Sequence, residues 1–392
     1  MATDTTRIRL SAIAVKTETT DGQDAFGGSA PALSDFIGAE VTFSLPQQTV
    51  EDTTLTGSFD RNAPIPTGIR PQITIRMPLR GSGSASIAPE WGKLMRACRF
   101  EEVQQAAPVG APTAATAGTE TSATLATPFA STAQAYRGMP IVLSGNPATS
   151  QLSTVLDYTS GRVATFPVSF NPPLSSATMA QIPANWLYRL TDDESLIRPV
   201  TIYMYRGGQR WRFVGCKGSM SLELVDANPG FITFTMRGQL LGAWESAAIP
   251  SGWNTVKRPQ APIWANGLSR LDRILARCAR YSYNSNVTLY DPENPEAPQG
   301  YDSPEITAAD SSVTIDPFSS TTNSAGRFIK FQVGTSMPFA AVLGAAVGNR
   351  IAVTNPSLRI TSYDDANRGE MGVDNLTLMP DVPGQGMFLA VF

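Results

Sequence analysis

Short runs of alternating apolar and polar residues recur along most of this chain. Val41 to Leu45, Ile73 to Met77, Met220 to Val225 and Phe231 to Met236 each carry apolar side chains at every second position. Alternation with a period of two is typical of a β-strand that buries one face and exposes the other. The pattern therefore predicts a mainly β protein of antiparallel strands joined by hairpins.

One segment has helical periodicity instead. The apolar residues Trp91, Leu94, Met95 and Cys98 are spaced i, i+3, i+4, i+7, and Pro89 precedes them. This predicts a short amphipathic helix that lies on a sheet. Residues 268–278 also have helical spacing, but the internal repeat described below favours an extended connector there, and both alternatives stay open.

Composition divides the chain into segments. Gly and Pro punctuate residues 1–39, which predicts an irregular N-terminal arm. In residues 106–133, 24 of 28 positions are Ala, Gly, Pro, Ser or Thr, a composition typical of a linker. Residues 134–190 return to short apolar runs with few charges, which predicts a small inserted β module.

The second half of the chain repeats landmarks of the first. Asp226-Ala227-Asn228-Pro229-Gly230 is similar to Asp365-Ala366-Asn367-Arg368-Gly369. The further matches are Pro89–Cys98 with Pro338–Val347, Val41–Phe43 with Val287–Leu289, and Ile73–Met77 with Phe328–Val333. A repeat of this kind predicts two similar domains, which we place at 40–105 plus 191–262 and at 263–392.

Composition also excludes most catalytic chemistry. The chain has no histidine and only three cysteines, none in a C-x-x-C pair, so histidine-dependent nucleophiles and common zinc sites are excluded. We expect no enzyme, no cofactor and no metal, and we expect buried free thiols in a reducing compartment. The net charge is -3, so the chain lacks the positive electrostatic field of a protein that binds nucleic acid tightly. Without a basic-then-apolar leader or a long apolar stretch, we expect synthesis in the cytoplasm and no membrane insertion.

Seven segments together carry a family resemblance: Glu40–Phe43, Ile73–Gly83, Pro89–Phe100, Gly215–Ser219, Phe231–Gly238, Gly348–Pro356 and Phe388–Phe392. With them the chain resembles the major tail tube proteins of bacteriophages with long, non-contractile tails. The resemblance implies two tandem tail-tube-type antiparallel β-sandwiches with short flanking helices, plus the small inserted β module. It also implies a virion protein, assembled in the host cytoplasm, whose stacked rings surround a tape-measure protein and later conduct genomic DNA without binding it specifically. Tail terminator and tip proteins would be further partners.

A second interpretation is a carbohydrate-binding or adhesin-like β protein of a phage tail. The aromatic residues Trp186 and Tyr188 in the insert favour it. A clustered site of aromatic and carboxylate residues is not evident in the sequence.

The tail-tube resemblance, taken with strand alternation, nominates candidate residues. The lumen-facing set is Ser221, Glu223, Thr233, Thr235, Arg359 and Thr361, because alternation places the members of each strand on one polar face. The inter-subunit set is Asp60, Arg61, Arg70 and Phe392, together with the arm 1–39. If six tube folds close a ring and each chain supplies two, three chains form a pseudo-sixfold ring. A ring of six chains is the alternative.

Overall fold

The computed structural model describes residues 11–146 and 149–392, and this part of the chain is mainly β, with several antiparallel sheets. The largest sheet has 18 strands. They are β1 (Ser11–Thr17), β2 (Phe36–Ile37), β3 (Glu40–Ser44), β6 (Gln72–Pro78), β7 (Phe100–Gln105), β16 (Asn185–Leu190), β17 (Val200–Arg206), β18 (Gln209–Val225), β19 (Phe231–Leu240), β20 (Glu245–Ser246), β21 (Ser269–Leu271), β22 (Ile274–Leu275), β23 (Cys278–Asn284), β26 (Ser312–Pro317), β27 (Met337–Leu343), β28 (Ile351–Arg368), β29 (Met371–Pro380) and β30 (Phe388–Val391).

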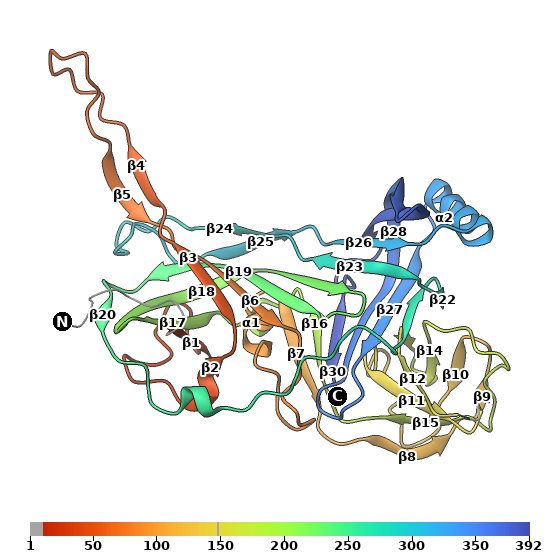
Figure 1. Cartoon of the computed structure of the whole chain (residues 1–392). Coiled ribbons are helices and arrows are strands. Elements are labelled where there is room, and N and C mark those ends of the chain that lie inside the picture. Colours follow the sequence, from red (N-terminus) through yellow and green to blue (C-terminus); the bar gives the residue numbers. More distant parts are fainter. Residues whose placement is uncertain (1–10, 147–148) are drawn as a thin grey trace.

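Smaller sheets and two α-helices complete the described residues. The hairpin of β4 (Gln47–Val50) and β5 (Ile65–Ile69) projects away from the body (Figure 1). A second hairpin consists of β24 (Val287–Tyr290) and β25 (Glu305–Ala309), and the helices are α1 (Gly92–Arg96) and α2 (Thr321–Val333). Eight strands form two four-stranded sheets: β8 (Val109–Ala114), β9 (Ala117–Gly118), β10 (Ser122–Thr124), β11 (Pro140–Ser144), β12 (Gln151–Thr154), β13 (Asp157–Tyr158), β14 (Val163–Thr165) and β15 (Met179–Ile182).

Two long strands, β18 and β28, each pair with different neighbours at their two ends. β18 pairs with β17 at its start and with β19 and β23 towards its end, and its register shifts between Val214 and Lys217. Gly215 lies at this bulge with a φ of +59°, and a Cβ there would meet the Ser303 hydroxyl at 2.0 Å. Glycine is therefore required where the strand bends.

One hydrophobic core underlies both of the domains expected from the sequence. Ile75 and Phe234 from the first share a single buried cluster with Tyr281 and Leu376 from the second. The 18-stranded sheet likewise runs through both, since β18 pairs with β23. The division at residue 262 therefore does not separate two independent cores.

Helix α1 confirms the helix expected within residues 89–98, but its proposed counterpart is wrong. Residues 338–347 lie largely in strand β27, whose seven residues are all buried, and residues 328–333 lie in helix α2 rather than in a strand. A strand buried on both faces is continuously apolar, so periodicity does not distinguish it from a helix. The extended alternative holds for 268–278, where β21 and β22 form a short hairpin before β23.

The expected boundaries of the insert are also corrected. The linker 106–133 instead contributes strands β8, β9 and β10, and Ala123, Leu125 and Phe129 are buried in a core with the residues that follow. At the other end, β16 leaves the insert and pairs with β7 and β30 in the main sheet. Residues 1–39 are not wholly irregular either, because β1 pairs with β17 along seven residues.

Residues 106–183, which we call the insert after the module expected there, pack directly against the body (Figure 1). The core of the insert includes Phe388 and Phe392 from the C-terminal strand region. Gly138 has a φ of +80°, and a Cβ there would lie 2.5 Å from the Phe388 ring.

We therefore expect Gly138→Ala to lower the free energy of unfolding by about 3 kcal/mol, because overpacking adds to backbone strain. The matched control is Gly208→Ala, since Gly208 has a φ of +85° and no atom within 4 Å of the added Cβ. Gly208→Ala is expected to lower the free energy of unfolding by about 1 kcal/mol, from backbone strain alone. Urea denaturation of both variants measures the difference, and equal losses would show that the insert does not press on Phe388.

Candidate functional site

Eight consecutive strands of the main sheet share one polar face. Pairing gives the order β3-β6-β19-β18-β23-β26-β29-β28. On one face, alternate residues such as Ile75, Phe234 and Leu376 enter the core. On the other face Ser, Thr and Asn residues are interspersed with charged residues, and we call it the polar face.

The eight strands consist of two sets of four with the same pairing. In the first set Val41 pairs with Ile75, Ile75 with Phe234, and Phe234 with Met220. In the second set the corresponding row is Tyr281, Ile315, Leu376 and Tyr363. The pattern of hydrogen-bonded neighbours is therefore repeated, set for set.

The repeat extends to the hairpins with a constant offset of 240 residues. The pair Gln47 and Ile69 in β4–β5 corresponds to Val287 and Ala309 in β24–β25. The Arg70 amide donates to the Pro46 carbonyl at the hairpin base, and the Asp310 amide donates to the Asn286 carbonyl in the same way. Residues 40–78 and 280–318 thus share strand register and closing hydrogen bonds.

The two sets join edge to edge. β18 of the first set pairs with β23 of the second over five residue pairs, from Ser221 with Asn284 to Val225 with Arg280. An ion pair at 2.7 Å between Glu223 and Arg280 crosses this join on the polar face.

The outer edges of the eight strands differ from this join. β3 pairs with β6 and has no second strand partner within residues 11–146 and 149–392. At the other end, β27 pairs with β28 only as far as Leu358, so residues 361–368 have a strand partner on one side alone in the described structure. Unpaired edges offer backbone N–H and C=O groups to another strand.

The charges on the polar face are balanced by neighbours of opposite sign. Besides the pair across the join, Arg76 lies 3.9 Å from Glu40, and Arg368 lies 3.1 Å from Asp316. These exposed pairs contribute little to stability. They do remove the excess of positive charge that would attract a polyanion.

The base of the projecting hairpin is held by a buried carboxylate. Asp291, whose side chain is 4% exposed, accepts a hydrogen bond from Arg70 at 2.8 Å and another from Arg237. The Arg70 guanidinium also lies over the Tyr301 ring. Each contact joins a different element, so the hairpin leaves the body at a fixed position.

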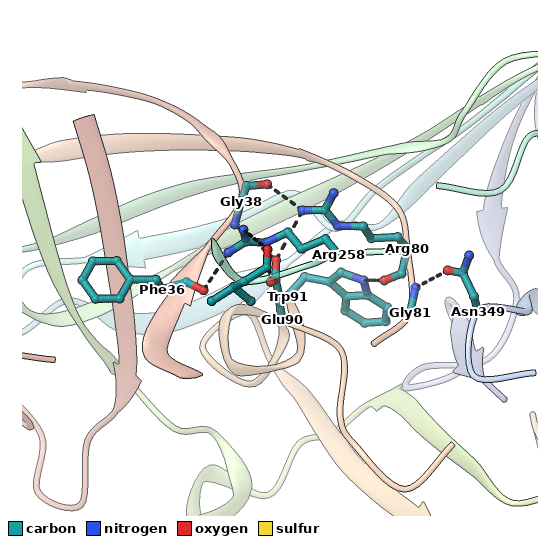
Figure 2. A network of polar contacts seen from close by, with 9 residues as sticks. Phe36, Gly38, Arg80, Gly81, Glu90, Trp91, Arg258 and Asn349 are labelled. Carbon is teal, nitrogen blue, oxygen red and sulfur yellow. Dashed lines mark hydrogen bonds and ion pairs between the residues drawn. The ribbon is translucent and has the colours of Figure 1, made fainter. Parts of the chain in front are cut away.

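A second polar network holds the connection between the two sets (Figure 2). The Glu90 carboxylate accepts hydrogen bonds from Arg258 at 2.5 Å, from Arg80 at 3.4 Å and from the Gly38 amide at 3.2 Å. Next to it, the Gly81 amide donates to the Asn349 side chain at 2.8 Å. These bonds tie segments from both halves of the chain together.

The structure brings four of the six nominated face residues together. Ser221 pairs directly with Thr233, and Glu223 and Thr235 lie beside them on the polar face. The other two, Arg359 and Thr361, are exposed on β28, where the Thr361 hydroxyl donates to the Thr377 carbonyl. None of the six is buried against the insert or α1.

The nominated contact residues are more scattered. Asp60 and Arg61 are exposed in the segment that joins β4 to β5, and Arg70 is engaged within its own chain as described above. Phe392 does not lie at an open strand edge. Phe392 is 2% exposed, and the adjoining strand β30 is paired on both sides, with β16 and with β28.

Sequence reasoning missed both outer edges. The sequence match aligned residues 41–43 with 287–289. In the structure, the residues equivalent to 41–43 are 281–283, because Tyr281 pairs with Ile315 as Val41 pairs with Ile75. The signal was present as the alternation of Tyr281 and Tyr283 with polar neighbours, but the apolar stretch after residue 286 resembled the first strand equally well.

Groups suited to catalysis or metal binding do not gather in the described residues. Within residues 11–146 and 149–392, no three His, Cys, Asp or Glu side chains are placed to hold a metal ion. Burial raises the pKa of the Cys98 and Cys216 thiols above the usual value, which opposes thiolate formation. Over the same residues, the helices are all too short or too polar to span a bilayer.

Comparison with known proteins gives no match: neither a protein-family model nor a curated protein is significantly similar to this sequence.

Proposed function

We propose that this chain is a structural virion protein that forms the tail tube of a bacteriophage with a long, non-contractile tail. In this proposal, copies of the chain join edge to edge into rings, and the rings stack into a conduit. The tape-measure protein occupies the conduit first, DNA passes through it later, and tail terminator and tip proteins bind its ends.

One observation carries the proposal: the structure already contains one edge-to-edge join between two equivalent four-stranded sets. The β18–β23 join has five residue pairs, and the shared pairing pattern of the four strands makes the two sets equivalent. We infer that they are two tandem tube-type units and that residues 106–183 are a module inserted in the first. Repetition of one join by rotation closes a ring when the angle divides a full turn.

The polar face supports its assignment as the lumen. A conduit must not hold the polymer that it passes, and each phosphate neutralised by Lys or Arg adds salt-dependent affinity. Ser221, Thr233 and Thr235 present hydroxyls there, while Glu223 is paired with Arg280. A neutral, hydroxyl-rich wall gives DNA no strong electrostatic attachment.

The two aromatic residues that favoured a carbohydrate-binding protein pack within the chain. Tyr188 is fully buried, its ring lies 4.9 Å from that of Trp91, and its hydroxyl donates to Glu102. Trp186 packs at the edge of the main core. Sugar-binding platforms need an accessible aromatic face, so these two residues do not supply one.

Negative-stain electron microscopy of the purified full-length chain tests the proposal. We expect rings or tubes, and class averages with three chains and pseudo-sixfold symmetry, because each chain supplies two units. Six chains in one ring would contradict the stoichiometry while preserving the function. Monodisperse monomers over a wide range of protein and salt concentration would contradict the function itself.

A further inference from the structure

The join within the chain predicts, residue by residue, how two copies pair. We propose that strand β3 of one copy adds to the exposed edge of β28 in a second copy, in the antiparallel register of the β18–β23 join. The inference rests on the proposed ring function and names the strands and the register through which the ring closes.

The register follows from two equivalences. Met220 and Tyr363 occupy the same place in their sets, as do Val41 and Tyr281. Within the chain, Leu224 pairs with Tyr281. Since Leu224 is four residues beyond Met220, its counterpart on β28 is Asn367, which therefore faces Val41 of the second copy.

The remaining pairs follow along the two strands: Arg368 with Glu40, Ala366 with Thr42, Asp365 with Phe43, and Asp364 with Ser44. On β28, residues 364–367 are exposed, and on β3 Glu40, Thr42 and Ser44 are exposed. Neither segment has a second strand partner in the described structure, and helix α2 contacts β28 through Phe328 and Phe331, which lie against Tyr363.

The charges at the two edges are complementary. In the join within the chain, the acid is on β18 (Glu223) and the base on β23 (Arg280). In the proposed join the signs are reversed, with the base on β28 (Arg368) and the acid on β3 (Glu40). Opposite charges that face each other across strands favour the pairing. β18 and β23 are each paired on both sides in the described structure, so neither offers an edge to a second copy.

Cysteine cross-linking tests the register in the intact chain. The variant Thr42→Cys/Ala366→Cys, in a Cys278→Ser background, places two thiols on the same face at the proposed join. Cys98 and Cys216 are buried and are retained. The matched control is Thr42→Cys/Asp365→Cys, because adjacent strand residues point to opposite faces. After mild oxidation we expect covalent multimers from the first variant alone, with a largest closed species of three chains on non-reducing electrophoresis.

The outcomes separate this inference from the function. Rings seen by microscopy without cross-links in the first variant, or with equal cross-linking in both variants, overturn the proposed register and leave the ring function standing. Cross-linked species larger than three chains support the register and overturn the threefold count. An absence of both rings and cross-links overturns the register and the function together.

A charge variant provides a second test that leaves the buried residues unchanged. Glu40→Lys places a cation opposite Arg368 of the next copy, and we expect assembly to require about tenfold more protein. Glu120→Lys changes an exposed acid in residues 106–183, away from the join and from the nominated contact residues, and should assemble as the wild type does. Equal effects from the two variants would overturn the proposed pairing.

Discussion

We expect Glu90→Gln to lower the free energy of unfolding by about 3 kcal/mol. Glu90 is the shared partner of Arg80 and Arg258, whose side chains are only 15% and 16% exposed. The amide that replaces the carboxylate accepts hydrogen bonds but carries no charge. Two largely buried guanidinium groups therefore lose the anion that offsets their desolvation, which is the costly way to break a buried ion pair.

Urea denaturation measures this loss, and hydrogen exchange locates it. The Gly38 amide donates to Glu90, so its exchange should accelerate more than that of core amides. The control is Glu51→Gln, since Glu51 and its partner Arg61 are both more than 80% exposed and 3.8 Å apart. Glu51→Gln should change the free energy of unfolding by no more than about 0.5 kcal/mol. Similar losses in both variants would show that the Glu90 network does not stabilise the junction.

Asp374→Asn is the second substitution with a large expected effect. It should also lower the free energy of unfolding by about 3 kcal/mol. The Asp374 side chain is 4% exposed and accepts hydrogen bonds from Arg327, Ser319 and Ser324, the first at 2.7 Å. These bonds attach helix α2 to strand β29. Removal of the charge leaves Arg327, which is 9% exposed, without its counter-ion.

The same site gives a pH dependence of defined sign. Burial acts to raise the pKa of Asp374, but the hydrogen bonds from Ser319, Ser324 and Arg327 outweigh it, and the net pKa lies below the ordinary value of 3.8. A lowered folded-state pKa stabilises the protein above the unfolded-state value and loses that contribution as the pH falls through the folded-state value. The difference in stability between wild type and Asp374→Asn should therefore be constant near neutral pH and shrink below about pH 4.

Asp364→Asn is the matched control for this prediction. Asp364 lies on the neighbouring strand β28, is exposed, and accepts a hydrogen bond only from the Ser362 hydroxyl among the described residues. Its replacement should change stability by less than about 0.5 kcal/mol. A gap between wild type and Asp374→Asn that persists unchanged at pH 3 would contradict an ionised Asp374 as its source.

Local pattern determined much of the strand content by itself. Ile73 to Met77, Met220 to Val225 and Phe231 to Met236 all form strands with the predicted face buried, because a period of two leaves each side chain one choice of face once a core exists. For the same reason Ser221, Glu223, Thr233 and Thr235 could be placed together before their neighbours were known. The short helix near residue 92 followed from spacing alone.

Tertiary structure alone decided which strands are central and which form edges. Phe388 to Phe392 and Met337 to Leu343 are apolar sequences that could form an edge strand, a core strand or a helix, and only their neighbours on both sides made them central strands. Residues 106–133 illustrate the opposite error. Alanine lacks the apolar area that marks a core strand in the sequence, yet Ala115 and Ala123 are buried beside Leu125 and Phe129, which supply the volume.

The repeat itself shows the same division. The expected match of the turn 226–230 with 365–369 falls on equivalent hairpins, but residues 365–368 lie in strand β28 and not in a turn. Short identities align at several offsets, so the register was not readable from them. The offset of 240 residues emerged from hydrogen-bonded pairs far apart in the sequence, such as Val41 with Ile75 and Tyr281 with Ile315. Pairing of distant strands depends on the shared core beneath them, and that core exists only once the whole chain has folded.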